Sequence, residues 1–208
     1  MYMEIATFVP VYQHLNMQAN KYINIANLIT LCRIFCLPFM VVIYEIPSID
    51  IVSKSLILSI AFIVLAATDW LDGYIARRFN MQSAFGAFLD PVADKIMVVV
   101  CLLILLDIGL IHYWAALIII LRELIISALR EWMAQIGSHK KVSVRYIGKL
   151  KTTAQMLSIP MLLFSPAVYH YFNSYHNVWS NIANFSMYIA VVLTIWSMMV
   201  YLKDALNN

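Results

Sequence analysis

Charged residues are scarce in this chain of 208 residues. Lysine, arginine, aspartate and glutamate together make up 12% of it, whereas an ordinary soluble domain contains about a quarter. Hydrophobic residues make up 63%, and the mean hydropathy is +0.81. This balance excludes a typical soluble domain and predicts several membrane-spanning segments. The net charge of +3 is too small to indicate a nucleic-acid-binding protein.

Cysteine is also rare, and each of the three cysteines, Cys32, Cys36 and Cys101, lies in an apolar run. An odd number without paired spacing argues against a disulfide framework. Cys32 and Cys36 have the spacing of a ligand pair on a helix, but we interpret them as small buried hydrophobic residues.

The first 20 residues lack the basic start and the long apolar core of a cleavable signal peptide. We interpret residues 1–20 as a tail or as a helix lying on the membrane surface. The sequence contains no internal repeat, and it leaves no room for a second, soluble domain. Residues 21–208 are therefore predicted to form one membrane domain.

Six hydrophobic segments are long enough to cross a hydrocarbon core of about 30 Å. Their limits are 25–44, 55–77, 84–107, 113–135, 150–170 and 181–203. The sequence thus predicts an all-α fold, a polytopic membrane bundle of six transmembrane helices.

The distribution of lysine and arginine predicts the orientation of this bundle. The basic residues are Lys21 before the first segment, Arg77 and Arg78 after the second, Lys140, Lys141 and Arg145 after the fourth, and Lys203 at the end of the sixth. The other links carry little positive charge. Because cytoplasmic links are enriched in lysine and arginine, both termini and the two basic links are predicted to be cytoplasmic.

Four aspartates lie beside the second and third apolar segments, where charge is otherwise avoided. Asp69 and Asp72 are three residues apart, and Asp90 and Asp94 are four apart, so each pair shares one helix face. The hairpin between these segments predicts that the four carboxylates meet at its cytoplasmic end. Charges near helix ends are often merely interfacial, which is the plainer interpretation for any one of them.

Four carboxylates at close range repel one another, and a divalent cation is the compensation that the sequence suggests. Oxygen ligands suit Mg²⁺, Mn²⁺ or Ca²⁺, and no histidine or cysteine lies near enough in the sequence to favour zinc. Of these ions we expect Mg²⁺ or Mn²⁺. Because such ions keep positions open for phosphate oxygens, a phosphate-containing substrate is also predicted.

The spacing of these residues resembles the signature of the CDP-alcohol phosphatidyltransferase family. The matching residues are Asp69, Asp72, Gly73, Ala76, Arg77, Gly86, Asp90 and Asp94. The flanking segments are similar to the branch of the family that uses glycerol 3-phosphate. They are "NIANLITLCRI", with Asn27, Thr30 and Arg33, and the later segments "LRELIISALRE" and "GKLKTTAQM". The resemblance covers roughly residues 22–203 and implies an integral membrane enzyme with six transmembrane helices.

The resemblance also implies a reaction and its residues. A phosphatidyl group passes from CDP-diacylglycerol to glycerol 3-phosphate, CMP is released and phosphatidylglycerol phosphate forms. Asp69, Asp72, Asp90 and Asp94 are the implied metal ligands, with Asp94 also the general base; Asp69, Gly73, Ala76 and Arg77 are the implied CDP-binding residues. The family further implies a homodimer and, for this branch, an active site at the cytoplasmic face of a bacterial inner membrane.

Three basic residues are candidates for binding the phosphate of the acceptor. Lys149 and Lys151 enter the fifth segment, and Arg122 lies well inside the fourth, where an unpaired charge is expensive. A structural ion pair is the alternative for Arg122, although its neighbour Glu123 is not expected to face it. Lys140 and Lys141 have a simpler interpretation as contacts to lipid headgroups.

Other functions fit the sequence less well. A related transferase could use phosphatidylglycerol, as a cardiolipin synthase does, or a serine or inositol-phosphate acceptor. A membrane prenyltransferase needs two separated aspartate clusters, and residues 132–203 contain no acid. A transporter with intramembrane carboxylates often shows inverted repeats, which are missing from this sequence.

Overall fold

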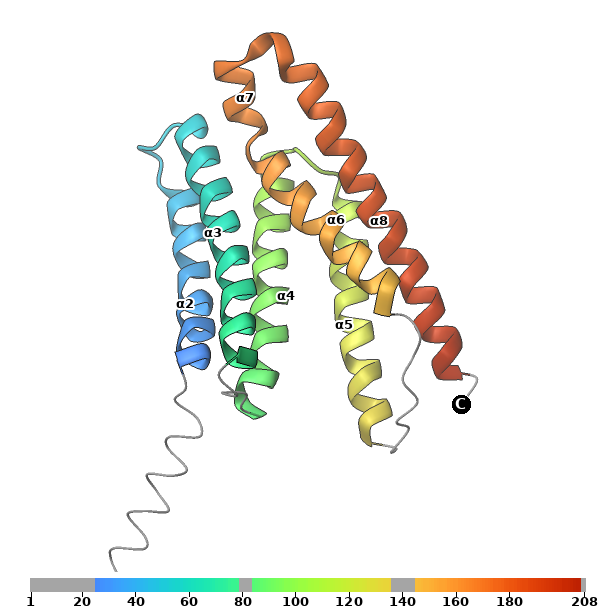
Figure 1. The fold of residues 1–208 in the computed structure, drawn as a ribbon. Helices are drawn as coiled ribbons and strands as arrows, with labels where there is room; N and C mark the ends of the chain where they lie inside the picture. Colours follow the sequence, from blue (N-terminus) through green and yellow to red (C-terminus); the bar gives the residue numbers. More distant parts are fainter. Residues whose placement is uncertain (1–24, 79–83, 136–144, 207–208) are drawn as a thin grey trace, which may run out of the picture. The chain divides into compact units, whose positions relative to one another are not determined.

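The computed structural model describes residues 25–78, 84–135 and 145–206, and every regular element in these ranges is a helix (Figure 1). The helices are α2 (Ile25–Glu45), α3 (Ile51–Arg78), α4 (Ala84–Asp107), α5 (Tyr113–Gln135), α6 (Arg145–Leu163), α7 (Ser165–Tyr171), the 3₁₀ turn η1 (Asn173–Tyr175) and α8 (His176–Leu206). The predicted all-α class is confirmed. The predicted tail, residues 1–20, lies outside the described residues.

Each of the six predicted segments overlaps one of the long helices, although α3, α6 and α8 begin four or five residues earlier than predicted, and the fifth segment needs a correction. The fifth segment, 150–170, is not continuous: α6 ends at Leu163 and α7 begins at Ser165. Pro166 lies in the first turn of α7 and has no backbone N–H to donate to the carbonyl of Leu162, so an unbroken helix is disfavoured. Hydropathy alone does not predict this break, because the residues on both sides of it are apolar.

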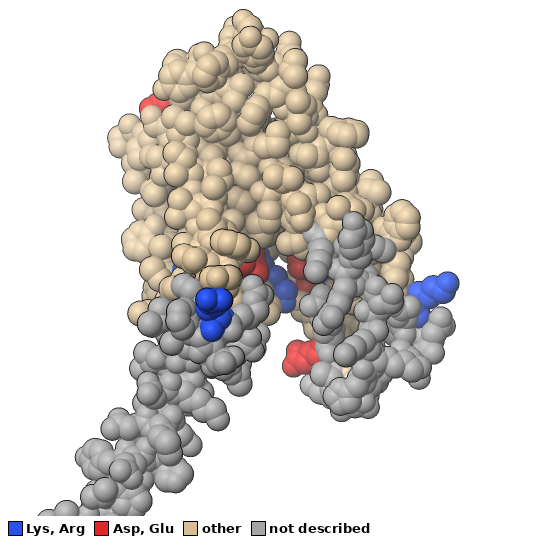
Figure 2. Space-filling view, viewed as in Figure 1, with Lys and Arg blue, Asp and Glu red and all other residues tan. Residues whose placement is uncertain are grey.

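Three stretches of the described residues are long and apolar enough to cross a membrane: Leu28–Glu45, Ile51–Leu71 and Asn173–Lys203. The other long helices carry charged residues within their apolar stretches, such as Asp94 in α4 and Arg122 in α5. Among the described residues, uncharged side chains dominate the face shown in Figure 2. Large apolar residues are widely exposed, as a lipid-covered surface requires. The structure thus supports a membrane protein, and the count of six spans stays a prediction.

The chain forms two compact units. The first contains α2 as far as Phe39, α3 from Val64 onward and α4 as far as Met97. Its buried apolar residues are Leu37, Leu65, Leu89, Ala93 and Met97. Thr30 and Arg33 are buried in the same unit although they are polar, which marks them as residues that require partners.

The second unit contains the remaining parts of α2, α3 and α4 together with α5 to α8. Helix α8 packs along α6 and α5 (Figure 1). Its buried residues recur in steps of three and four: Ala183, Met187, Ala190, Thr194 and Ser197. This is the spacing of a helix seam, and the small side chains on it allow close approach of a neighbouring helix.

The start of α3 is fixed by a local cap. The carboxylate of Asp50 accepts hydrogen bonds from the backbone N–H of Ser53 at 2.9 Å and from its hydroxyl at 2.8 Å. These bonds favour the ionised carboxylate and lower the pKa of Asp50 below its usual value. Asp50 therefore acts as the N-terminal cap of α3.

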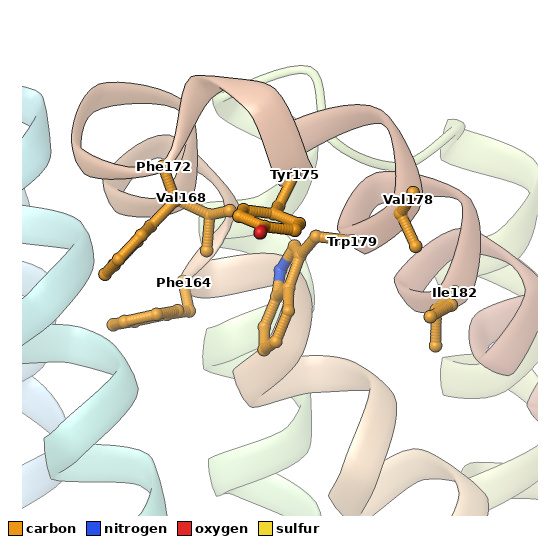
Figure 3. Close-up of a pocket in the computed structure, with 7 residues that line it drawn as sticks. All are labelled: Phe164, Val168, Phe172, Tyr175, Val178, Trp179 and Ile182. Carbon is orange, nitrogen blue, oxygen red and sulfur yellow. The ribbon is translucent and has the colours of Figure 1, made fainter.

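An apolar pocket of about 410 Å³ is lined by residues of α7, η1, the start of α8 and the junctions beside α7 (Figure 3). Its walls are aliphatic and aromatic side chains, among them Phe164, Val168 and Trp179. The indole N–H of Trp179 donates to the carbonyl oxygen of Met161 at 3.0 Å, close to the break between α6 and α7. This lining provides no charged group for phosphate chemistry, so the candidate site lies elsewhere.

Candidate active site

The first unit places the aspartates on the helices that the sequence predicts. Asp69 and Asp72 lie on α3, and Asp90 and Asp94 lie on α4. The side chain of Asp72 is outside the described residues. The other three carboxylates all contact side chains of α2. The sequence predicts no catalytic or metal-binding residue on this helix.

Arg33 of α2 joins two of these carboxylates. Its Nη1 atom lies 2.5 Å from Oδ1 of Asp69 and 3.1 Å from Oδ1 of Asp94. The side chain of Arg33 is 0% exposed, whereas those of Asp69 and Asp94 are 34% and 38% exposed. A buried guanidinium thus holds two carboxylates whose oxygens stay partly open to a ligand.

Thr30 binds the third described carboxylate. Its hydroxyl donates to Oδ1 of Asp90 at 2.8 Å. Thr30 and Arg33 are three residues apart on α2, and their partners Asp90 and Asp94 are four apart on α4, so one face of each helix carries both contacts. The sequence pattern singled out Thr30 and Arg33 only because they resemble the family. Their position inside an apolar segment is the signal that they need polar partners.

The arrangement changes one expectation about charge. The sequence predicts a divalent cation as the compensation for the aspartates, and the structure adds a second source, the guanidinium of Arg33. Asp69 and Asp94 present oxygens that converge on a single cationic atom, which is the donor chemistry that Mg²⁺ or Mn²⁺ prefers. In the part of the chain that the structure describes, no three acidic, histidine or cysteine side chains lie close enough to hold an ion. The four-aspartate metal site therefore stays a prediction.

The predicted nucleotide-binding residues are only partly described. Gly73 is half-buried on α3. Gly86, a residue of the same signature, is buried on α4. The side chains of Ala76 and Arg77 lie outside the described residues. Their assignment to CDP binding remains a prediction.

A second polar cluster lies in the second unit and involves two of the predicted acceptor residues. Nη1 of Arg122, on α5, lies 3.1 Å from Oε1 of Glu123, and Nζ of Lys151, on α6, contacts the same oxygen. The side chains of Arg122 and Lys151 are each 4% exposed, and that of Glu123 is 18% exposed. The structure therefore brings Arg122 and Lys151 together, whereas the side chain of Lys149 is not described.

Two features of this cluster were not predicted. Glu123 was not expected to face Arg122 because adjacent helical residues point in different directions, but the long arginine side chain reaches it. The other guanidinium nitrogen, Nη2, lies 3.0 Å from Oγ of Ser197, and the ring of Tyr201 lies 6.0 Å from the guanidinium carbon. Ser197 is buried on α8 and Tyr201 follows it four residues later on the same helix, which has no acidic residue before Asp204.

The cluster places two nearly buried cations against one carboxylate. Such charge is costly inside a membrane protein unless it is offset by nearby groups or by a bound anion. The cluster is thus chemically suited to an anionic ligand, and a phosphate fits the charge of its donors.

Comparison with known proteins agrees with these features. The family model described as CDP-alcohol phosphatidyltransferase matches residues 23–196. Proteins named CDP-diacylglycerol–glycerol-3-phosphate 3-phosphatidyltransferase from Salmonella choleraesuis strain SC-B67, Salmonella typhi and Escherichia coli strain K12 are each 42% identical over 189 residues. The match covers 88% of this chain and 94% of each relative. On this evidence the chain is a member of the CDP-alcohol phosphatidyltransferase family.

Proposed function

We propose that this protein transfers the phosphatidyl group of CDP-diacylglycerol to glycerol 3-phosphate, releasing CMP and forming phosphatidylglycerol phosphate. The observation that carries the proposal is the 42% identity, over 88% of the chain, to enzymes named for that reaction. The partly open carboxylates of Asp69 and Asp94 support a site for phosphoryl transfer.

In the proposed reaction a hydroxyl oxygen of glycerol 3-phosphate attacks the phosphorus atom that bears the lipid. The bond between this phosphorus and the CMP oxygen breaks, and CMP leaves with the bonding electrons. Asp94 accepts the proton of the attacking hydroxyl, which keeps the nucleophile from carrying a positive charge. Arg33 holds the carboxylate of Asp94 in place, and Thr30 does the same for Asp90.

Asp69, Asp72, Asp90 and Asp94 are the proposed ligands of Mg²⁺ or Mn²⁺. When bound, the metal neutralises negative charge on the phosphoryl oxygens. Asp69, Gly73, Ala76 and Arg77 are the proposed contacts to the CDP group. Small residues at two of these positions leave room for the nucleotide to approach the helix backbone.

Arg122, Lys149 and Lys151 are the proposed contacts to the phosphate of the acceptor. The convergence of Arg122 and Lys151 on one carboxylate oxygen supports this assignment, because it holds two phosphate-binding cations close together.

The proposed setting is a bacterial inner membrane, with six spans, both termini in the cytoplasm and the active site at the cytoplasmic face. The bacterial origin of the relatives and the apolar helices support the membrane. The basic residues of the two predicted cytoplasmic links support the orientation. We further propose a homodimer, as implied by the family.

An acceptor screen tests the function directly. Purified protein in detergent, supplied with CDP-diacylglycerol and either Mg²⁺ or Mn²⁺, should release CMP with glycerol 3-phosphate. It should do so much more slowly with phosphatidylglycerol, serine or inositol phosphate. Faster release with one of the other acceptors would reassign the substrate within the family, and no release with any of them would refute the transferase function.

A further inference from the structure

The contacts of Glu123 converge on one atom. Nη1 of Arg122 and Nζ of Lys151 both contact Oε1 of Glu123. The two cationic groups come from different helices, α5 and α6, and are therefore held within two hydrogen-bond lengths of each other. Ser197 of α8 also fixes the position of Arg122, because Nη2 of Arg122 donates a hydrogen bond to Oγ of Ser197 at 3.0 Å.

The burial of these groups makes the shared carboxylate necessary. Arg122 and Lys151 are nine-tenths buried or more, so solvent does little to weaken their mutual repulsion. Without an anion between them, the two side chains would move apart. The carboxylate of Glu123 lies between them and contacts both.

Two cations held at a fixed separation suit a site that binds an anion such as phosphate. The shared contact to Oε1 of Glu123 provides that fixed separation. We propose that Glu123 is a positioning residue of the acceptor-phosphate site. It holds Arg122 and Lys151 side by side as a pair of cations that binds the phosphate of glycerol 3-phosphate.

Because this role rests on the proposed function, its test is a kinetic comparison in protein that already makes phosphatidylglycerol phosphate. Glu123→Gln keeps the size of the side chain and an acceptor oxygen but removes the charge. We expect the KM for glycerol 3-phosphate to rise about tenfold, while the KM for CDP-diacylglycerol stays within twofold. Equilibrium titration calorimetry with glycerol 3-phosphate should show the same loss of affinity without turnover.

Glu131→Gln is the matched control because Glu131 is an exposed glutamate on the same helix. Its KM values should equal those of the unaltered protein. Glu123→Asp keeps the charge on a side chain one methylene shorter, and we expect it to recover part of the affinity that Glu123→Gln loses.

Three outcomes would overturn the role of Glu123 while leaving the transferase reaction intact. The first is an unchanged or lowered KM for glycerol 3-phosphate in Glu123→Gln. The second is an equal rise of both KM values together with a lower melting temperature, which is the pattern of a structural ion pair. The third applies if Glu123→Gln does not fold, in which case Glu123→Asp is measured instead. A KM for glycerol 3-phosphate in Glu123→Asp equal to that of the unaltered protein would then overturn the role.

Discussion

Nη1 of Arg33 lies 2.5 Å from Oδ1 of Asp69, and this contact joins a fully buried cation on α2 to a partly exposed carboxylate on α3. The same nitrogen reaches Asp94 on α4. Three helices are therefore tied together by one guanidinium at the place where the family signature puts its aspartates. The orientation of Asp69 and Asp94 therefore depends on Arg33, which is not part of the aspartate signature.

Arg33→Lys keeps the positive charge but replaces the planar guanidinium with a single ammonium group. Changes to groups that orient metal ligands typically cost about 10- to 100-fold in activity. Because Asp69 and Asp94 are proposed ligands, we expect a fall of this size in the rate of CMP release. Arg78→Lys, at an exposed arginine of α3, is the control and should leave the rate unchanged. Full activity in Arg33→Lys would show that the aspartates do not need this anchor.

Thr30 offers a cleaner test of orientation because its side chain carries no charge. Thr30→Val has nearly the same shape but cannot donate to Asp90, whereas Thr30→Ser keeps the hydroxyl. We expect Thr30→Val to lower turnover about tenfold and to weaken the activation by Mn²⁺. Thr30→Ser should retain most of the activity, and equal rates for the two variants would mean that the hydroxyl plays no part.

Spacing and hydropathy predict much of this site because both are local properties. The long apolar runs give the helices, and steps of three and four residues put Asp69 with Asp72, and Asp90 with Asp94, on common faces. The family match confirms the resemblance that this spacing suggested. The limits of α4 and α5 agree with the predicted segments to the residue.

The partners of the buried cations could not be predicted in the same way. Arg33 is separated from Asp94 by 61 positions in the chain, and only the packing of α2 against α4 brings them together. The contact between Arg122 and Glu123 depends on how a long side chain bends, which helical periodicity does not describe. Burial of a charge predicts that a partner exists, but it does not say which residue it is.

Asp94→Asn tests the proposed general base. An amide cannot accept the proton of the acceptor hydroxyl at neutral pH, so we expect turnover to fall about 100- to 10,000-fold. The fold should persist, because Asp69 still offers a carboxylate to Arg33. Asp107→Asn, at an exposed aspartate on the same helix, is the control. Robust CMP release by a folded Asp94→Asn protein would remove Asp94 from the role of base.

The two lysines of α6 should differ in a way that separates binding from stability. Lys149→Ala is expected to raise the KM for glycerol 3-phosphate more than the KM for CDP-diacylglycerol. Lys151→Ala should do the same and should also lower the melting temperature, since it removes one of two cations from the largely buried carboxylate of Glu123. A larger effect of Lys149→Ala on the lipid donor would move Lys149 out of the acceptor site.

The hydrogen bond of Trp179 near the break between α6 and α7 can be tested apart from catalysis. The indole N–H donates to the carbonyl of Met161 at 3.0 Å, and Trp179→Phe keeps an aromatic ring there but removes the donor. The net contribution of one hydrogen bond is about 0.5–1.5 kcal/mol, so we expect a slightly lower melting temperature in detergent and unchanged KM values. Trp196→Phe, at an exposed position of α8, should not shift the melting temperature. If Trp179→Phe melts like the unaltered protein, the carbonyl of Met161 is sufficiently paired by the hydroxyl of Ser165, which lies 3.1 Å from it.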